Sequence, residues 1–120
     1  MNKQTYFPEV INWAQEHGFD EIRANLPDNN TYETPIRYER VQDDVAFTPD
    51  VTGKSFSNKS YFEVILKTDK IQRLLSKLKL ISLLASRQKG KLYLMVPKGH
   101  FQFARNMCRT HRLRAELVKL

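Results

Sequence analysis

Residues 61–67 read YFEVILK, an apolar run that contains a single acidic side chain, Glu63. Such a run is typical of a strand that is buried on both faces at the centre of a sheet. Residues 69–88 follow with Leu and Ile at helical spacing, and residues 92–96, LYLMV, form a second apolar strand that ends at Pro97. A helix between two strands is a crossover, which favours parallel pairing of those strands. This stretch therefore predicts an α/β fold.

Segments on both sides of this stretch also have the patterns of regular structure. They are a helix at residues 8–17, extended segments at 32–41 and 45–51, and a helix after Gly99. The last segment, residues 113–120, fits a short strand or a helix, and we favour the strand. Residues 52–60, TGKSFSNKS, are polar and predict a loop before the central strand. The first three strands would then form a hairpin meander. We therefore expect a mixed central sheet flanked by helices, in a single domain of residues 1–120.

Composition excludes several classes of protein. Apolar residues make up 41% of the 120 residues, which is typical of a chain that folds around a core. The first residues contain no apolar run of the kind found in signal peptides, and no apolar stretch is long enough to span a bilayer. Cys108 is the single cysteine, which excludes an internal disulfide and a multi-cysteine zinc site. We expect a cytoplasmic protein with no membrane partner.

The net charge of +7 is unevenly distributed along the chain. Residues 1–53 hold four Lys or Arg and ten Asp or Glu, whereas residues 54–120 hold sixteen Lys or Arg and three Asp or Glu. A strongly basic half is typical of proteins that bind a polyanion such as nucleic acid. The alternative is a solvated lysine-rich surface, and composition alone leaves both interpretations open.

Two groups of basic residues in the second half of the chain have helical spacing. They are Lys70, Arg73 and Lys77 in one group, and Arg105, Arg109 and Arg112 in the other. Each group would lie on one face of a helix, where Lys and Arg can contact phosphates. The solvent face of an ordinary amphipathic helix is the alternative for each group, and the two groups together favour nucleic-acid binding more than either does alone.

Aromatic residues divide into a predicted core set and a predicted surface set. Phe56 and Tyr61 flank the polar loop, so they are the aromatic residues expected at the surface, where a nucleic-acid base can stack. Phe47, Phe62 and Tyr93 lie in apolar segments, and we assign them to the core.

An acidic residue stands on each of two predicted strands. Asp50 follows Pro49 at the end of the second strand, and Glu63 lies thirteen residues later on the third, which ends at Lys67. Because Glu63 is surrounded by apolar residues, it should be paired with a nearby Arg or Lys, exposed at an edge, or functional. For Asp50 the alternative is an ordinary turn aspartate after proline.

These residues and this order of elements resemble the PD-(D/E)XK nuclease superfamily, which has the restriction-endonuclease-like fold. That family has an αβββαβ core, with an acid on the second strand and a (D/E)-x-K triplet on the third. The resemblance covers about residues 6–110, most of the chain. It implies the same core here, with the mixed sheet flanked by helices.

The resemblance implies a hydrolase that cleaves DNA with the help of Mg²⁺ or Mn²⁺. A divalent cation lowers the pKa of the attacking water and neutralises developing charge, and Mg²⁺ prefers carboxylate and water ligands. Asp50 and Glu63 would be the metal ligands, and Lys67 would orient the nucleophile or stabilise negative charge. DNA as the partner and a homodimer as the assembly are also implied by the family.

The chain departs from the family pattern at Ile65, which stands where the acid two residues before Lys67 is expected. Glu63 is four residues before Lys67, on the same strand face, but four residues span about 13 Å of strand and two span about 7 Å. The site therefore uses a displaced acid, recruits another acid, pairs Asp50 with Lys67 alone, or is inactive. The acids that could be recruited are Glu16, Glu21 and Asp69.

Three functions remain open at this point. The first is a metal-dependent nuclease that uses Asp50, Glu63 and Lys67. The second is a catalytically inactive module that retains the fold and binds nucleic acid or a protein partner, which Ile65 favours. The third is a scaffold domain whose basic half contacts an acidic partner.

Overall fold

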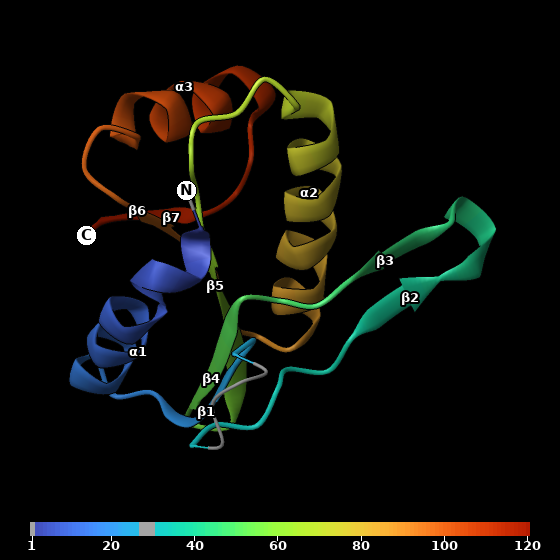
Figure 1. Ribbon diagram of the computed structural model, residues 1–120. Helices are drawn as coiled ribbons and strands as arrows, with labels where there is room; N and C mark the ends of the chain where they lie inside the picture. The colour runs from blue at the N-terminus through green and yellow to red at the C-terminus, as the bar shows by residue number, and fades with distance from the viewer. Residues whose placement is uncertain (1, 27–30) are drawn as a thin grey trace.

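The structure is a computed structural model that describes residues 2–26 and 31–120, including every side chain in these ranges except that of Asp43. Its centre is a five-stranded sheet in the order β1-β4-β5-β6-β7 (Figure 1). The strands are β1 (Asp20–Ala24), β4 (Val51–Ser55), β5 (Asn58–Val64), β6 (Leu92–Val96) and β7 (Glu116–Lys119). Residues 25–31, NLPDNNT, have the composition of a turn, and most of this segment lies outside the described residues.

The sheet is mixed, as the sequence predicts. β1, β4 and β5 are antiparallel neighbours, whereas β5, β6 and β7 are parallel. The helix α2 (Ile71–Arg87) provides the crossover from β5 to β6, and α3 (Phe101–His111) provides the crossover from β6 to β7. The predicted α/β class, with a mixed sheet flanked by helices, is therefore confirmed.

Helices cover both faces of the sheet, so there are two cores. One face packs against α1 (Phe7–Glu16), which follows the short 3₁₀ helix η1 (Lys3–Tyr6), and the other face packs against α2 and α3. Alternation along β5 sends Phe62 and Val64 towards α1, and Tyr61 and Ile65 towards α2. Glu63 lies between Tyr61 and Ile65 in this alternation, so its side chain is on the α2 face.

The antiparallel part of the sheet uses different segments from those predicted. Its first strand is β1, which the sequence analysis missed, and residues 32–41 do not enter the central sheet. Residues 52–60, predicted as a loop, form most of the β4–β5 hairpin, which turns at Phe56 and Ser57. Asp50 consequently stands just before the second strand of the meander, and its predicted place at the end of that strand is wrong.

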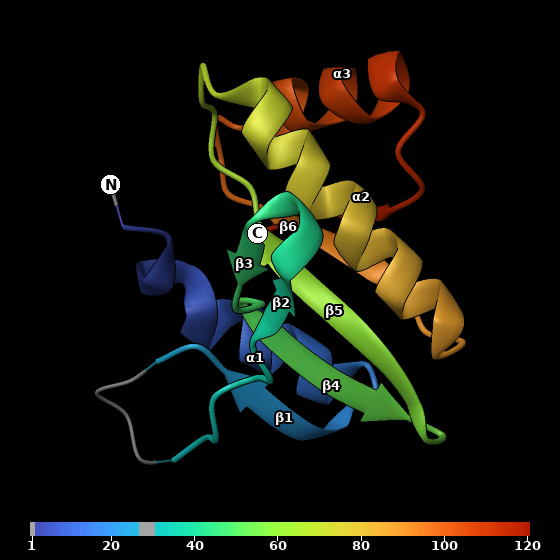
Figure 2. The ribbon, with the colours of Figure 1, turned by 90° about the vertical axis from the view of Figure 1, so that its right-hand side faces the viewer.

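Residues 32–51 do contain a hairpin, but it is a separate two-stranded sheet. Its strands are β2 (Tyr38–Arg40) and β3 (Val45–Phe47), joined by the 3₁₀ helix η2 (Val41–Asp43). The Tyr38 and Phe47 rings stack with their centroids 5.2 Å apart, whereas Val41 is 92% exposed. Figures 1 and 2 show this arm extending away from the central sheet beside α2.

Candidate functional site

The two acidic residues singled out in the sequence lie side by side at the start of β4 and the end of β5. Val51 pairs with Phe62 in the antiparallel register, which places Asp50 opposite Glu63. Both side chains are buried, with 1% of Asp50 and 2% of Glu63 exposed. Charged side chains are rarely buried to this extent unless they are paired or functional.

Backbone hydrogen bonds fix one oxygen of each carboxylate. The Asp50 N–H donates to Glu63 Oε2 at 2.7 Å, and the Val64 N–H donates to Asp50 Oδ2 at 2.9 Å. These reciprocal bonds join the two strands just beyond the regular β4–β5 ladder. Each carboxylate therefore keeps one oxygen, Asp50 Oδ1 and Glu63 Oε1, for another partner.

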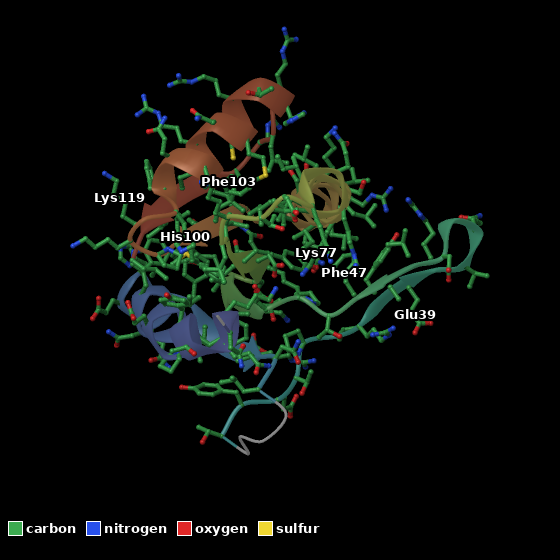
Figure 3. All side chains as sticks on the ribbon, turned by 45° about the horizontal axis from the view of Figure 1, so that its top comes forward. Glu39, Phe47, Lys77, His100, Phe103 and Lys119 are labelled. Atoms are coloured by element: carbon green, nitrogen blue, oxygen red, sulfur yellow. The ribbon has the colours of Figure 1, made fainter. Side chains whose placement is uncertain are left out.

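Two lysines from distant segments face these remaining oxygens. Lys3 Nζ, from η1, lies 2.8 Å from Asp50 Oδ1, and Lys77 Nζ, from α2, lies 3.1 Å from Glu63 Oε1. Lys77 Nζ also lies 5.8 Å from the centroid of the Phe47 ring, and Figure 3 shows these two side chains together beside α2. We call Lys3, Asp50, Glu63 and Lys77 the charged quartet.

Hydrogen bonds and ion pairs compensate the two buried carboxylates of the quartet only in part. The contact of Lys3 with Asp50 Oδ1 is an ion pair without the alignment of a hydrogen bond, so this buried oxygen has no hydrogen-bond partner among the described residues. Burial of Glu63 and its repulsion by Asp50 raise the pKa of the Glu63 carboxyl to about 7, against the opposing effect of Lys77 and Lys3. A positive charge near the two carboxylates therefore stabilises their ionised forms.

The acid pair also changes the pKa of Lys77. Burial lowers the pKa of an ammonium group, but attraction to Glu63 and then to Asp50 outweighs it, so the pKa of Lys77 is raised. Lys77 therefore remains charged at neutral pH, with 24% of its side chain exposed.

The acid pair fits a divalent cation of the Mg²⁺ type. Two carboxylates side by side are a common side-chain contribution to such a site, with water and substrate phosphates as further ligands. Here a cation would have to share or displace the ammonium groups of Lys3 and Lys77, which face Asp50 Oδ1 and Glu63 Oε1. Across residues 2–26 and 31–120, no cluster of three or more His, Cys, Asp or Glu forms a larger metal site. The predicted additional acids Glu16, Glu21 and Asp69 are all exposed and do not join the pair.

The predicted catalytic lysine, Lys67, is not near the acid pair. Its side chain is exposed, and its backbone N–H donates to His100 Nδ1 at 2.8 Å, beside the start of α3. Ile65, at the position where the family pattern has an acid, is buried in the core under α2. Among the described residues, the lysines that contact the carboxylates are Lys77 and Lys3.

The sequence predicts Lys77 on a phosphate-binding helix face and indicates no role for Lys3. A signal for Lys77 was present: it lies next to Leu78 and three residues after Leu74, so it belongs to the inner edge of the helix. For Lys3 no pattern in the sequence indicates a contact with Asp50, because the two residues are far apart in the chain.

The remaining basic candidates lie on two separate surfaces. Lys70 and Arg73 are exposed and line a hollow of about 590 Å³ between α2 and β3 of the arm, which also reaches Lys77. The second group lies on and just after α3, and all three members are exposed: Arg105, Arg109 and Arg112. The first surface leads to the quartet, so it is the better placed of the two for a substrate.

The aromatic predictions are mostly confirmed. Phe56 is 97% exposed, as expected, and Phe47 and Phe62 are buried. Tyr93 is partly buried and stacks on Phe62 with the ring centroids 5.0 Å apart. Tyr61, expected at the surface, is only 3% exposed, because β5 starts earlier than predicted and places it under α2.

No helix among the described residues has the length and apolar character needed to cross a membrane. Comparison with family models, curated proteins and solved structures gave no match.

Proposed function

We propose that this protein is a metal-dependent phosphodiester hydrolase that acts on nucleic acid, related to the PD-(D/E)XK nucleases. The observation that carries the proposal is the buried pair of Asp50 and Glu63, held side by side with Lys77 at 3.1 Å from Glu63. Buried acids with a perturbed pKa next to a lysine are typical of catalytic sites. DNA is the substrate that the resemblance favours.

Asp50 Oδ1 and Glu63 Oε1 are the atoms that would hold Mg²⁺ or Mn²⁺. When bound, the metal would activate a water molecule and neutralise charge on the phosphate. Lys77 would place an ammonium group beside the reacting phosphate and stabilise the negative charge that develops there. In this proposal Lys77 takes the role that the family resemblance implies for Lys67.

The substrate would approach along the hollow between α2 and the arm. Lys70 and Arg73 line this hollow together with Lys77, so successive phosphates of one nucleic-acid strand could contact all three basic side chains. Contacts of this kind position a nucleic acid without reading its sequence.

A second candidate function is a catalytically inactive module that binds nucleic acid or a protein partner. The observation that favours it is the ion pair of Lys3 with Asp50 at 2.8 Å. Together with Lys77, this ammonium group already balances the charge of both carboxylates. In such a module the two lysines would replace the metal permanently.

The test is nicking of supercoiled plasmid in Mn²⁺ by the full chain, beside three variants. Asp50→Asn and Lys77→Met should lower the rate by about 100-fold or more, the size of effect seen when one electrostatic catalytic group is removed. Lys67→Met is the matched control and should cleave like the wild type. Equal loss in Lys67→Met and Lys77→Met would contradict the role of Lys77. Absence of nicking, with a salt-sensitive gel shift, would favour the inactive module.

A further inference from the structure

The tip of the β4–β5 hairpin, residues 54–59 (KSFSNK), combines features that do not favour folding. The two central residues of its turn, Phe56 and Ser57, have φ values of 52° and 69°. Hairpin turns with two positive φ values strongly favour Asn and Gly, and a positive φ is unusual for a bulky side chain. Phe56 nevertheless occupies this position with 97% of its surface exposed.

The same six residues bring two like charges together. Lys54 and Lys59 are directly opposite each other in the β4–β5 ladder, and directly opposed like charges destabilise a sheet. Burial, and then repulsion by Arg23 and Lys54, lower the pKa of the half-buried Lys59. Arg23 comes from the neighbouring strand β1, so three strands contribute a cation to one place.

Nearby carboxylates compensate only part of this positive charge. Glu21 lies 3.9 Å from Lys54, and Glu33 lies 3.5 Å from Arg23; both carboxylates are largely exposed. Exposed ion pairs at such distances contribute little. Among the described residues, Lys59 has no carboxylate within ion-pair distance, and its ammonium lies 5.2 Å from the centroid of the Tyr61 ring.

The three cations line one hollow on the sheet face that carries the acid pair. The hollow has a volume of about 570 Å³, and its charged lining residues are the three cations Arg23, Lys54 and Lys59 and the two carboxylates Glu21 and Glu33. Lys59 and Glu63 are four residues apart on β5 and point to the same face, about 13 Å from one another. Figure 2 shows the tip of the β4–β5 hairpin projecting at the lower right. Phe56, which lies in this turn, is exposed to solvent.

We propose that this hairpin tip binds a single-stranded segment of nucleic acid, with a base stacked on Phe56 and an adjacent phosphate held by Lys54, Lys59 and Arg23. An exposed aromatic ring beside a basic groove is the usual arrangement for binding single strands. The proposal rests on the proposed function in one respect: it takes the bound single strand to be part of the nuclease substrate. Binding at the hairpin tip itself needs neither the metal nor Asp50. It explains why residues unfavourable for the turn are concentrated there.

The test is fluorescence anisotropy of a short labelled single-stranded DNA of mixed sequence, titrated with the full chain in EDTA. Phe56→Asn should weaken binding by about tenfold, which is within the range for loss of one base–aromatic stack. Phe56→Tyr keeps an aromatic ring and should bind with the affinity of the wild type. The double variant Lys54→Gln/Lys59→Gln should reduce the salt dependence of log K by about one unit of slope. Lys79→Gln, an exposed lysine on α2, is the control for loss of charge and should change the affinity little.

A second readout separates this role from a structural one. Phe56→Asn should raise the Tm of the free protein, because Asn tolerates a positive φ better than Phe does, while it lowers the affinity for the strand. Unchanged binding by Phe56→Asn, equal weakening by Lys79→Gln, or tighter binding of the corresponding duplex than of the single strand would each overturn the proposal. The anisotropy is measured in EDTA, without the metal that nicking requires, so a failure of nuclease activity leaves this result unaffected.

Discussion

Asp50 and Glu63 are stable as buried charges only because each has two compensating partners. One partner is a backbone N–H and the other is an ammonium group, from Lys3 or from Lys77. Removing one member of a buried ion pair typically costs about 3–5 kcal/mol, because the other charge is left without compensation. The four residues should therefore be treated as one electrostatic unit, in which the effects of substitutions are not additive.

Glu63 should make stability depend on pH in a defined direction. Its pKa is raised from about 4.5 to about 7 in the folded protein, so the folded state binds a proton more tightly than the unfolded state does. The free energy of unfolding should consequently be highest below about pH 4.5 for this group and fall as pH rises through about 7. The expected change is up to ~3 kcal/mol.

Urea denaturation of the metal-free protein at a series of pH values measures this effect. The difference between the wild type and Glu63→Gln isolates the contribution of this one carboxyl from those of other titrating groups. If the difference in unfolding free energy is constant between pH 4.5 and 7, Glu63 does not titrate as described.

The sequence indicated the acid pair but not its partners. Glu63 stood out because an acid within an apolar strand requires a partner or a function, and the structure supplies Lys77 as that partner. The family resemblance implies Lys67 because of its position after Glu63 on the same strand. The structure instead provides a lysine from the crossover helix, a contact that depends on how α2 packs on β5 and that no local spacing encodes.

At the level of elements, apolar strands and helices were predicted well, whereas the edge of the sheet was not. β6, α2 and α3 lie where their apolar patterns place them, and β7 confirms the predicted final strand. β1 reads DEIRA and was missed, because an edge strand with exposed positions can be rich in charge. The β4–β5 turn was missed because it lacks the Asn or Gly that usually marks a hairpin.

The close approach of Gly90 to the backbone of β5 can be tested directly. It lies between α2 and β6, and a Cβ at this position would overlap the Lys59 carbonyl on β5. Gly90→Ala should therefore destabilise the protein by ~3 kcal/mol, the upper end of the usual range for overpacking, because backbone atoms must move. Gly99→Ala is the matched control: its φ is +90°, but no atom lies within 4 Å of the added Cβ.

Thermal denaturation of the two glycine variants provides the comparison. Gly99→Ala should show only the moderate effect of a positive φ, about 1–2 kcal/mol. A loss for Gly90→Ala no greater than that for Gly99→Ala would show that β5 and the loop before β6 can separate without cost.

At the scale of the whole molecule, the acidic and basic halves of the chain meet in the candidate site. Lys3 and Asp50 come from residues 1–53, and Glu63 and Lys77 come from residues 54–120. The excess positive charge of the second half remains on exposed parts of α2, α3 and the β4–β5 hairpin. This arrangement agrees with a polyanionic partner for the surface, while the buried site is electrically balanced.

We propose that Asp50 and Glu63 form a divalent-cation site, in which Lys3 pairs with Asp50 when no metal is bound. Isothermal titration calorimetry with Mn²⁺ on the wild type, Lys3→Met and Asp50→Asn tests it most directly. We predict binding to the wild type, about tenfold tighter binding to Lys3→Met because a competing charge is removed, and no binding to Asp50→Asn. Failure of both the wild type and Lys3→Met to bind Mn²⁺ would contradict the account.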